Sequence, residues 1–104
     1  MPYGLEKETL QKIIAIFAQY GAVQEAIIYG SRAKGNHKPG SDIDLTLKGS
    51  DLNLKILNQI GLDLDDLLLP YTFDLSIYHH IQQPDLIDHI LQVGKVFYQR
   101  GRDH

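Results

Sequence analysis

The sequence predicts an α+β domain built on one small mixed β-sheet, with helices packed on one face of that sheet. Two segments, residues 42–48 and 72–78, alternate apolar and polar side chains with the period of a half-buried strand. Around them, apolar residues recur at helical spacing, so that strands and helices share one core. A chain of 104 residues suits one compact domain, which we expect to span residues 1–104.

The first half of the chain is expected to form a helix and two strands. Residues 6–20 carry a one-sided apolar stripe, and Gly21 is well placed to end that helix. Residues 22–29 close in a continuous apolar run, which is typical of a central strand buried on both sides and is broken by Gly30. A loop rich in Gly, Lys and Pro then leads to the alternating strand at residues 42–48.

The segment between the two alternating strands is expected to be helical. Ser50 or Asp51 is a suitable N-terminal cap for a helix through residues 57–60. Residues 62–70 predict a second short helical piece, which a proline at its end would stop.

The last third of the chain predicts a strand and a helix. Residues 72–78 place apolar side chains on one side and polar side chains on the other. Pro84 is favourable in the first turn of a helix with a clear apolar stripe, and Gly94 is expected to end it. Residues 95–100 remain as a short terminal stretch.

Composition excludes several classes of function. The net charge of −3 provides no global basic field for a nucleic-acid backbone, so direct nucleic-acid binding is not expected. The chain has no cysteine, which rules out disulfides and thiolate zinc sites. It has neither a secretory leader pattern nor an apolar run that could span a bilayer, so we expect a cytoplasmic protein without membrane contact.

Three aspartates lie on the polar sides of the alternating strands: Asp42 and Asp44 on the first and Asp74 on the second. If the strands are neighbours, the three carboxylates share one face. Two such charges about 6.5–7 Å apart repel by only ~0.6 kcal/mol in water, so repulsion alone does not require a cation. A partly enclosed face would require one, and Mg²⁺ prefers oxygen ligands of this kind. A solvated polar face is the alternative, although aspartate is disfavoured in strands.

The turn after the first strand has features of a phosphate site. Gly30 lets the backbone approach a ligand closely, and Ser31 offers a hydroxyl and an N–H near the start of a short helix. Arg32 and Lys34 add positive charge. A Gly-Ser turn by itself is usually only a turn with a helix cap. Followed at short range by a strand with metal-binding carboxylates, it forms a coherent Mg-nucleotide site.

The two halves of this site resemble a known signature. Gly30-Ser31, ten intervening residues and Asp42-Ile43-Asp44 resemble the motif of the polymerase-β-type nucleotidyltransferase superfamily. The stretches GSRAKG and SDIDL are similar to those of its smallest members, the minimal nucleotidyltransferases (MNT), and the likeness continues through LPYTFDLSIY and PDLIDHILQVGKVFY. The resemblance implies the nucleotidyltransferase fold and Mg²⁺-dependent transfer of a nucleoside monophosphate from ATP or another nucleoside triphosphate.

The resemblance also implies roles for individual positions. Asp42 and Asp44 match the metal-binding pair of the family. Asp74 occupies the place of the third carboxylate, which ligates the catalytic metal or activates the attacking hydroxyl. All three are thus the expected catalytic and metal-binding residues. The expected nucleotide-binding residues are Gly30, Ser31, Arg32 and Lys34.

The acceptor of the nucleotide is expected to come from outside the chain. Predicted helices and strands use almost every residue, so we expect another molecule to supply the acceptor or part of its pocket, which would fit a homo- or hetero-oligomer. Minimal nucleotidyltransferases are similar to the antitoxin partner of HEPN-domain proteins, which implies transfer of AMP to a tyrosine of a HEPN-domain toxin. Two alternatives stay open: transfer to a small molecule such as an antibiotic, and a catalytically silent module that binds its partner by contact.

The histidines suggest no further site by themselves. His37 in the loop and His89 on the last helix are expected at the surface. The His79-His80 pair ends the second alternating strand, and one of its rings could approach the aspartates, although such pairs more often face solvent.

Overall fold

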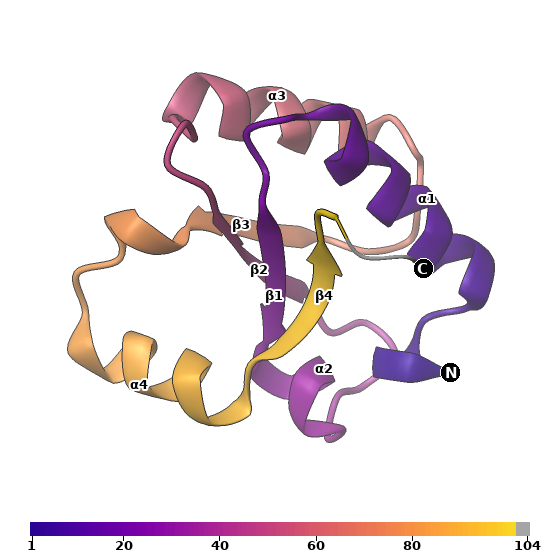
Figure 1. Ribbon diagram of the computed structural model, residues 1–104. Coiled ribbons are helices and arrows are strands. Elements are labelled where there is room, and N and C mark those ends of the chain that lie inside the picture. The colour runs from indigo at the N-terminus through magenta and orange to yellow at the C-terminus, as the bar shows by residue number, and fades with distance from the viewer. Residues whose placement is uncertain (102–104) are drawn as a thin grey trace.

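The computed structural model describes residues 1–101 and confirms a small mixed sheet combined with helices (Figure 1). Its elements are η1 (Pro2–Gly4), α1 (Lys7–Gln19), β1 (Glu25–Tyr29), α2 (Gly30–Lys34), β2 (Ile43–Lys48), α3 (Leu54–Asp65), β3 (Phe73–Ile77), η2 (Tyr78–His80), α4 (Pro84–Val93) and β4 (Lys95–Gln99). Within residues 1–101 the strand order is β3-β2-β1-β4. Strand β1 is antiparallel to both of its neighbours, whereas β2 and β3 are parallel.

One face of the sheet carries the hydrophobic core. Helices α1 and α3 pack together on this face, as Figure 1 shows. The antiparallel register places Ile28 of β1 opposite Leu45 of β2, and both are completely buried. Burial of several side chains of this size supplies most of the stability of a small domain. The core side chains with no exposed surface include Ile13, Phe17, Val23, Ile28, Leu45, Leu47 and Ile60.

Helices α2 and α4 lie together at the end of β1, away from α1 and α3 (Figure 1). Helix α4 contacts the side of β1 that faces away from the core, because His89 packs on Tyr29 and Gly94 lies against Ile27. The two long helices therefore cover the apolar face, as predicted, and α4 closes one end of the opposite face. No helix in residues 1–101 has the length and apolar character needed to cross a membrane.

Strand β4 is the main element that the sequence did not predict. From the sequence we expect only a short terminal stretch over residues 95–100, whereas Lys95–Gln99 pairs with β1 along the edge of the sheet. The usual alternation is missing because Phe97 and Tyr98 are both buried and the pairing shifts register at a bulge. Arg100, directly after the strand, donates hydrogen bonds to the carbonyl oxygens of Tyr20 at 2.7 Å and Val23 at 3.0 Å.

A single helix, α3, replaces the two helical pieces expected on either side of Gly61. An internal glycine costs about 1 kcal/mol relative to alanine, which the packing of a helix against the core can outweigh. The cap also differs from the prediction of Ser50 or Asp51. Asn53 is the N-terminal cap, and its Oδ1 accepts a hydrogen bond from the N–H of Ile56 at 2.9 Å.

Candidate active site

Three side chains form a row across the polar face of the sheet: Tyr29, Asp44 and Asp74. The antiparallel register pairs Tyr29 with Asp44, and the parallel register pairs Asp44 with Asp74. Paired residues of neighbouring strands point to the same face, and the strands lie about 4.8 Å apart. Asp42 lies directly before β2, two residues from Asp44, and therefore on the same side of the chain. The structure thus brings the three aspartates to one end of one face.

Within residues 1–101, the three aspartates have few groups that could balance their charges. Asp44 is half-buried, whereas Asp42 and Asp74 are exposed. Burial, and then the charges of Asp74 and Asp42, raise the pKa of Asp44 above its ordinary value of 3.8, while the nearby His89 acts in the opposite direction. Within residues 1–101, no side chain forms a hydrogen bond or an ion pair with any of the three carboxylates.

The three carboxylates fit a hard divalent cation by their chemistry. Their oxygens are the ligands that Mg²⁺ prefers, and a cation would favour the charged form of Asp44, which burial and then the neighbouring carboxylates disfavour when they raise its pKa. Across the described residues, however, no group of three His, Asp or Glu side chains is close enough together to hold a metal ion. Mg²⁺ is commonly bound by one or two carboxylates together with substrate phosphates, so a preformed protein cage is not required.

The Gly30–Ser31 turn lies directly against this row. Helix α2 begins at Gly30, immediately after β1. The φ of Gly30 is +71°, a left-handed conformation that favours glycine, and a Cβ at this position would collide with Oδ2 of Asp44. The two halves of the sequence motif, Gly30-Ser31 and the Asp42–Asp44 pair, are therefore in contact in the folded chain.

His89 belongs to this cluster, although the sequence placed it at the surface. The N–H of Gly30 donates a hydrogen bond to Nε2 of His89 at 3.2 Å. The imidazole also packs edge-on against Tyr29, with ring centroids 6.1 Å apart and an interplanar angle of 80°. Its helical position, three residues after Leu86 at the border of the apolar stripe, is only a weak signal in the sequence.

Arg32, expected to bind nucleotide, is used inside the fold. Its side chain is only 2% exposed. The guanidinium donates to the carbonyl oxygen of Tyr3 at 2.9 Å and twice to that of Ser41, at 3.1 and 2.9 Å, and it lies 4.9 Å from the ring centre of Tyr71. This placement gives Arg32 a structural role, in contrast to the expectation from the sequence.

Lys34 lies in the last turn of α2 and is exposed. It borders a cavity of about 410 Å³ that is also lined by His37 and Lys95, and none of the three aspartates is among the lining residues. His37 was expected at the surface, but its ring packs on Gly4, and its buried Nδ1 has no hydrogen-bond partner within residues 1–101. Nucleotide binding by Lys34 stays a prediction.

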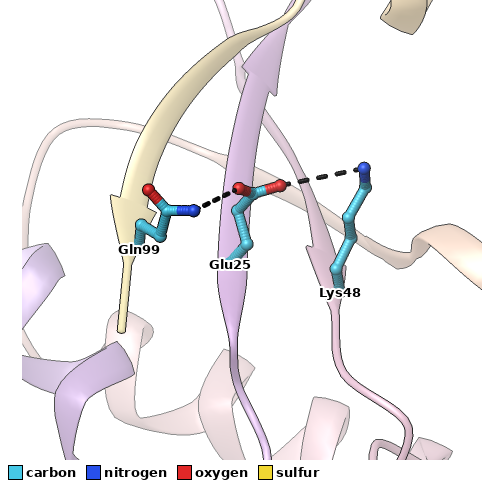
Figure 2. Close-up of polar contacts among 3 residues, drawn as sticks. All are labelled: Glu25, Lys48 and Gln99. Atoms are coloured by element: carbon cyan, nitrogen blue, oxygen red, sulfur yellow. Dashed lines mark hydrogen bonds and ion pairs between the residues drawn. The ribbon is translucent and has the colours of Figure 1, made fainter. Parts of the chain in front are cut away.

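A fourth carboxylate, Glu25, lies at the opposite end of the same sheet face and has polar partners (Figure 2). Lys48 Nζ lies 3.7 Å from one oxygen of Glu25, and Gln99 donates a hydrogen bond of 3.2 Å to the other. Between the two ends, the hydroxyl of Ser76 donates to that of Thr46 at 2.9 Å. The carboxylates that lack partners are thus found at the end of the face where the Gly30 turn lies.

The chain matches a protein-family model over most of its length. The model described as polymerase beta, nucleotidyltransferase matches residues 11–103. Among curated proteins, no sequence matches the chain.

Solved structures share the fold at low sequence identity. A toxin–antitoxin complex with AMP-PNP gives a TM-score of 0.71 at 21% identity, covering 88% of this chain and 74% of that chain. The tri-AMPylated HEPN toxin of Shewanella oneidensis in complex with its MNT antitoxin gives 0.68 at 18% identity, covering 91% and 73%. The MntA–HepT toxin–antitoxin complex gives 0.66 at 19% identity, covering 90% and 73%.

Proposed function

The chain belongs to the polymerase β nucleotidyltransferase family, and we propose that it transfers AMP from ATP to a hydroxyl acceptor in a Mg²⁺-dependent reaction. One observation carries this proposal: Asp44, which with Asp42 and Asp74 forms no hydrogen bond or ion pair to a side chain of residues 1–101, is in contact with the Gly30–Ser31 turn. A phosphate-accepting turn beside uncompensated carboxylates is the arrangement that a metal-bound triphosphate requires.

The proposed roles follow from where the groups lie. Asp42, Asp44 and Asp74 would hold Mg²⁺, which when bound neutralises charge on the triphosphate and polarises the phosphorus that is attacked. Gly30 lets the turn lie directly against Asp44, because Oδ2 of Asp44 occupies the space where a side chain of residue 30 would begin. Ser31 offers its hydroxyl and N–H to the phosphate oxygens.

The reaction exchanges one phosphorus–oxygen bond for another. The acceptor oxygen forms a bond to the α-phosphorus, the bond from the α-phosphorus to the bridging oxygen breaks, and pyrophosphate leaves. The hydroxyl proton passes to a carboxylate, for which we propose Asp74, an exposed residue opposite Asp44. The remaining residues of the site act mainly by positioning the reactants and by stabilising charge.

We propose further that the acceptor is a tyrosine of a HEPN-domain toxin and that the chain is its antitoxin. The support comes from proteins of the same fold, one of which is an MNT antitoxin in complex with a tri-AMPylated HEPN toxin, while another complex contains AMP-PNP. Transfer to a small molecule and silent binding of a partner are the competing functions.

Mass spectrometry of a reaction mixture separates these functions. The protein is incubated with Mg-ATP and a HEPN-domain protein from a neighbouring gene, and the partner is then weighed. A gain of AMP units supports adenylylation, a stable complex of unchanged mass supports binding alone, and ATP turnover that leaves the partner unmodified supports a small acceptor. The variants Asp42→Ala and Asp44→Ala are the controls, and full activity in both would contradict the proposed site.

A further inference from the structure

We propose that His89 is a positioning residue that fixes the Gly30–Ser31 turn against Asp44 for nucleotide binding. This inference rests on the proposed function, because it concerns how the same site receives its nucleotide. Three contacts made by the described residues support it.

The first contact is a hydrogen bond that spans the chain. As the first residue of α2, Gly30 has no helical partner for its N–H, and glycine is the residue with the greatest backbone freedom. Nε2 of His89, which is 59 residues away in sequence, accepts this N–H at 3.2 Å. Because Nε2 acts as an acceptor, the proton of the neutral ring is on Nδ1. The imidazole therefore supplies the partner that the helix cannot.

The second contact holds the imidazole itself. Its ring packs edge-on against Tyr29, which is buried and which pairs with Asp44 across the sheet. The neighbouring residue in α4, Ile90, is 3% exposed and anchors the helix. His89 thus extends from a packed helix onto a packed strand, and side chains on such elements hold their partners more precisely than side chains on loops.

The third contact joins Gly30 to Asp44. The carboxylate of Asp44 occupies the space where a Cβ would be, so that Gly30 contacts both His89 and Asp44. Without the imidazole, the N–H would turn to solvent and the turn would have to be ordered again each time nucleotide binds. Ordering a loop during binding weakens affinity without changing the contacts in the complex.

The experiment compares variants that keep or remove the acceptor. His89→Ala and His89→Leu cannot accept the Gly30 N–H, and Leu preserves most of the volume of the side chain. His89→Gln can accept it through Oε1. His80→Ala, at an exposed histidine, is the matched control. Mg-ATP affinity is measured by calorimetry, and exchange of the Gly30 amide hydrogen is measured by NMR.

We expect Ala and Leu to weaken Mg-ATP binding by about fivefold to tenfold, the effect of one hydrogen bond, and to accelerate exchange at Gly30. Gln restores both properties, and His80→Ala changes neither. In the transfer assay, the KM for ATP rises while kcat at saturating ATP is retained, a separation that general loss of structure would not produce. If His89→Ala does not fold, as judged by circular dichroism, the comparison of Leu with Gln decides.

The failures of the two proposals are distinguishable. If the wild-type protein does not bind Mg-ATP, the proposed function fails. If the wild-type protein binds it and the Ala and Leu variants bind equally well or more tightly, the role of His89 is overturned and the proposed function stands. A Gln variant no better than Leu also overturns it.

Discussion

Glu25 and Asp44 lie on the same face of the same sheet but in opposite electrostatic surroundings. Glu25 is flanked by Lys48 and Gln99, which provide a cation and a hydrogen-bond donor (Figure 2). Asp44 has Asp74 as its paired neighbour, and the pKa of Asp44 is raised above 3.8 by burial first and by neighbouring charge second. A carboxylate with partners belongs to the fold, whereas Asp44, which lies among like charges, is where we propose that a counter-charge binds from outside the chain.

The largest expected effect is the loss of activity when the carboxylate without partners is changed. Asp44→Asn keeps the shape of the side chain but removes its charge, so AMP transfer should fall by about 100-fold to 1000-fold. Glu25→Gln makes the same chemical change at the other end of the face and should leave the rate unchanged. The rates are compared at saturating Mg-ATP. Similar losses of AMP transfer in the two variants would show that the two ends of the sheet face do not differ in function.

The next effect concerns Arg32, a charged residue that has hydrogen-bond partners inside the fold but directly follows the Gly30–Ser31 turn. Arg32→Met leaves two carbonyl oxygens without their donors, so the free energy of unfolding should fall by about 2–3 kcal/mol. Urea denaturation measures this loss. Mg-ATP affinity should stay close to wild type, because the guanidinium faces into the fold. A stable variant with lost affinity would instead restore Arg32 as a nucleotide-binding residue.

A smaller effect of opposite sign is expected for the stability of Asp44→Asn. The folded state raises the pKa of Asp44, so the contribution of Asp44 to stability is greatest below pH 3.8 and is lost as the pH rises through the folded pKa. Above that window the variant, which has no charge to bury, should be more stable by ~0.5 kcal/mol, or about 2–4 °C in melting temperature. Thermal melts without Mg²⁺ from acid to neutral pH test this. A variant that is less stable than wild type at neutral pH would show that Asp44 supports the fold.

The smallest effect is expected at Glu25 itself. Glu25→Gln removes a partly exposed ion pair with Lys48, which should cost ~0.5 kcal/mol or less and should cost less still in high salt. Urea denaturation at low and high ionic strength measures this difference. A gain in stability would show that the charge of Glu25 destabilises the folded state, as we expect for Asp44.

The sheet and the acidic row could be predicted because local patterns determine them. Alternation assigns every residue of β2 and β3 to a face, so Asp44 and Asp74 share a side once the strands are neighbours. The apolar run that ends in Tyr29 indicated a central strand, and β1 does have partners on both edges. Gly30 directly follows β1 and therefore lies at the same end of the sheet as Asp44.

The remaining features depend on contacts between distant segments. No periodic pattern in the sequence predicts two of these contacts: the hydrogen bond from Gly30 to His89 and the burial of Arg32 under η1. Strand β4 was missed because its bulged register puts two consecutive side chains, Phe97 and Tyr98, into buried positions. A charged residue beside a functional turn looks the same in sequence whether it faces a ligand or the protein interior.

The pairing of β4 with β1 affects when the sheet that carries the candidate site is complete. On the ribosome, β1 and the turn that follows it emerge long before Lys95–Gln99, and until then one edge of β1 has no neighbour. Pairing between segments so far apart in sequence is slow compared with local folding. A partly synthesised chain therefore carries the Gly30–Ser31 turn on an incomplete sheet, and β1 gains its second neighbour only after translation has delivered Lys95–Gln99.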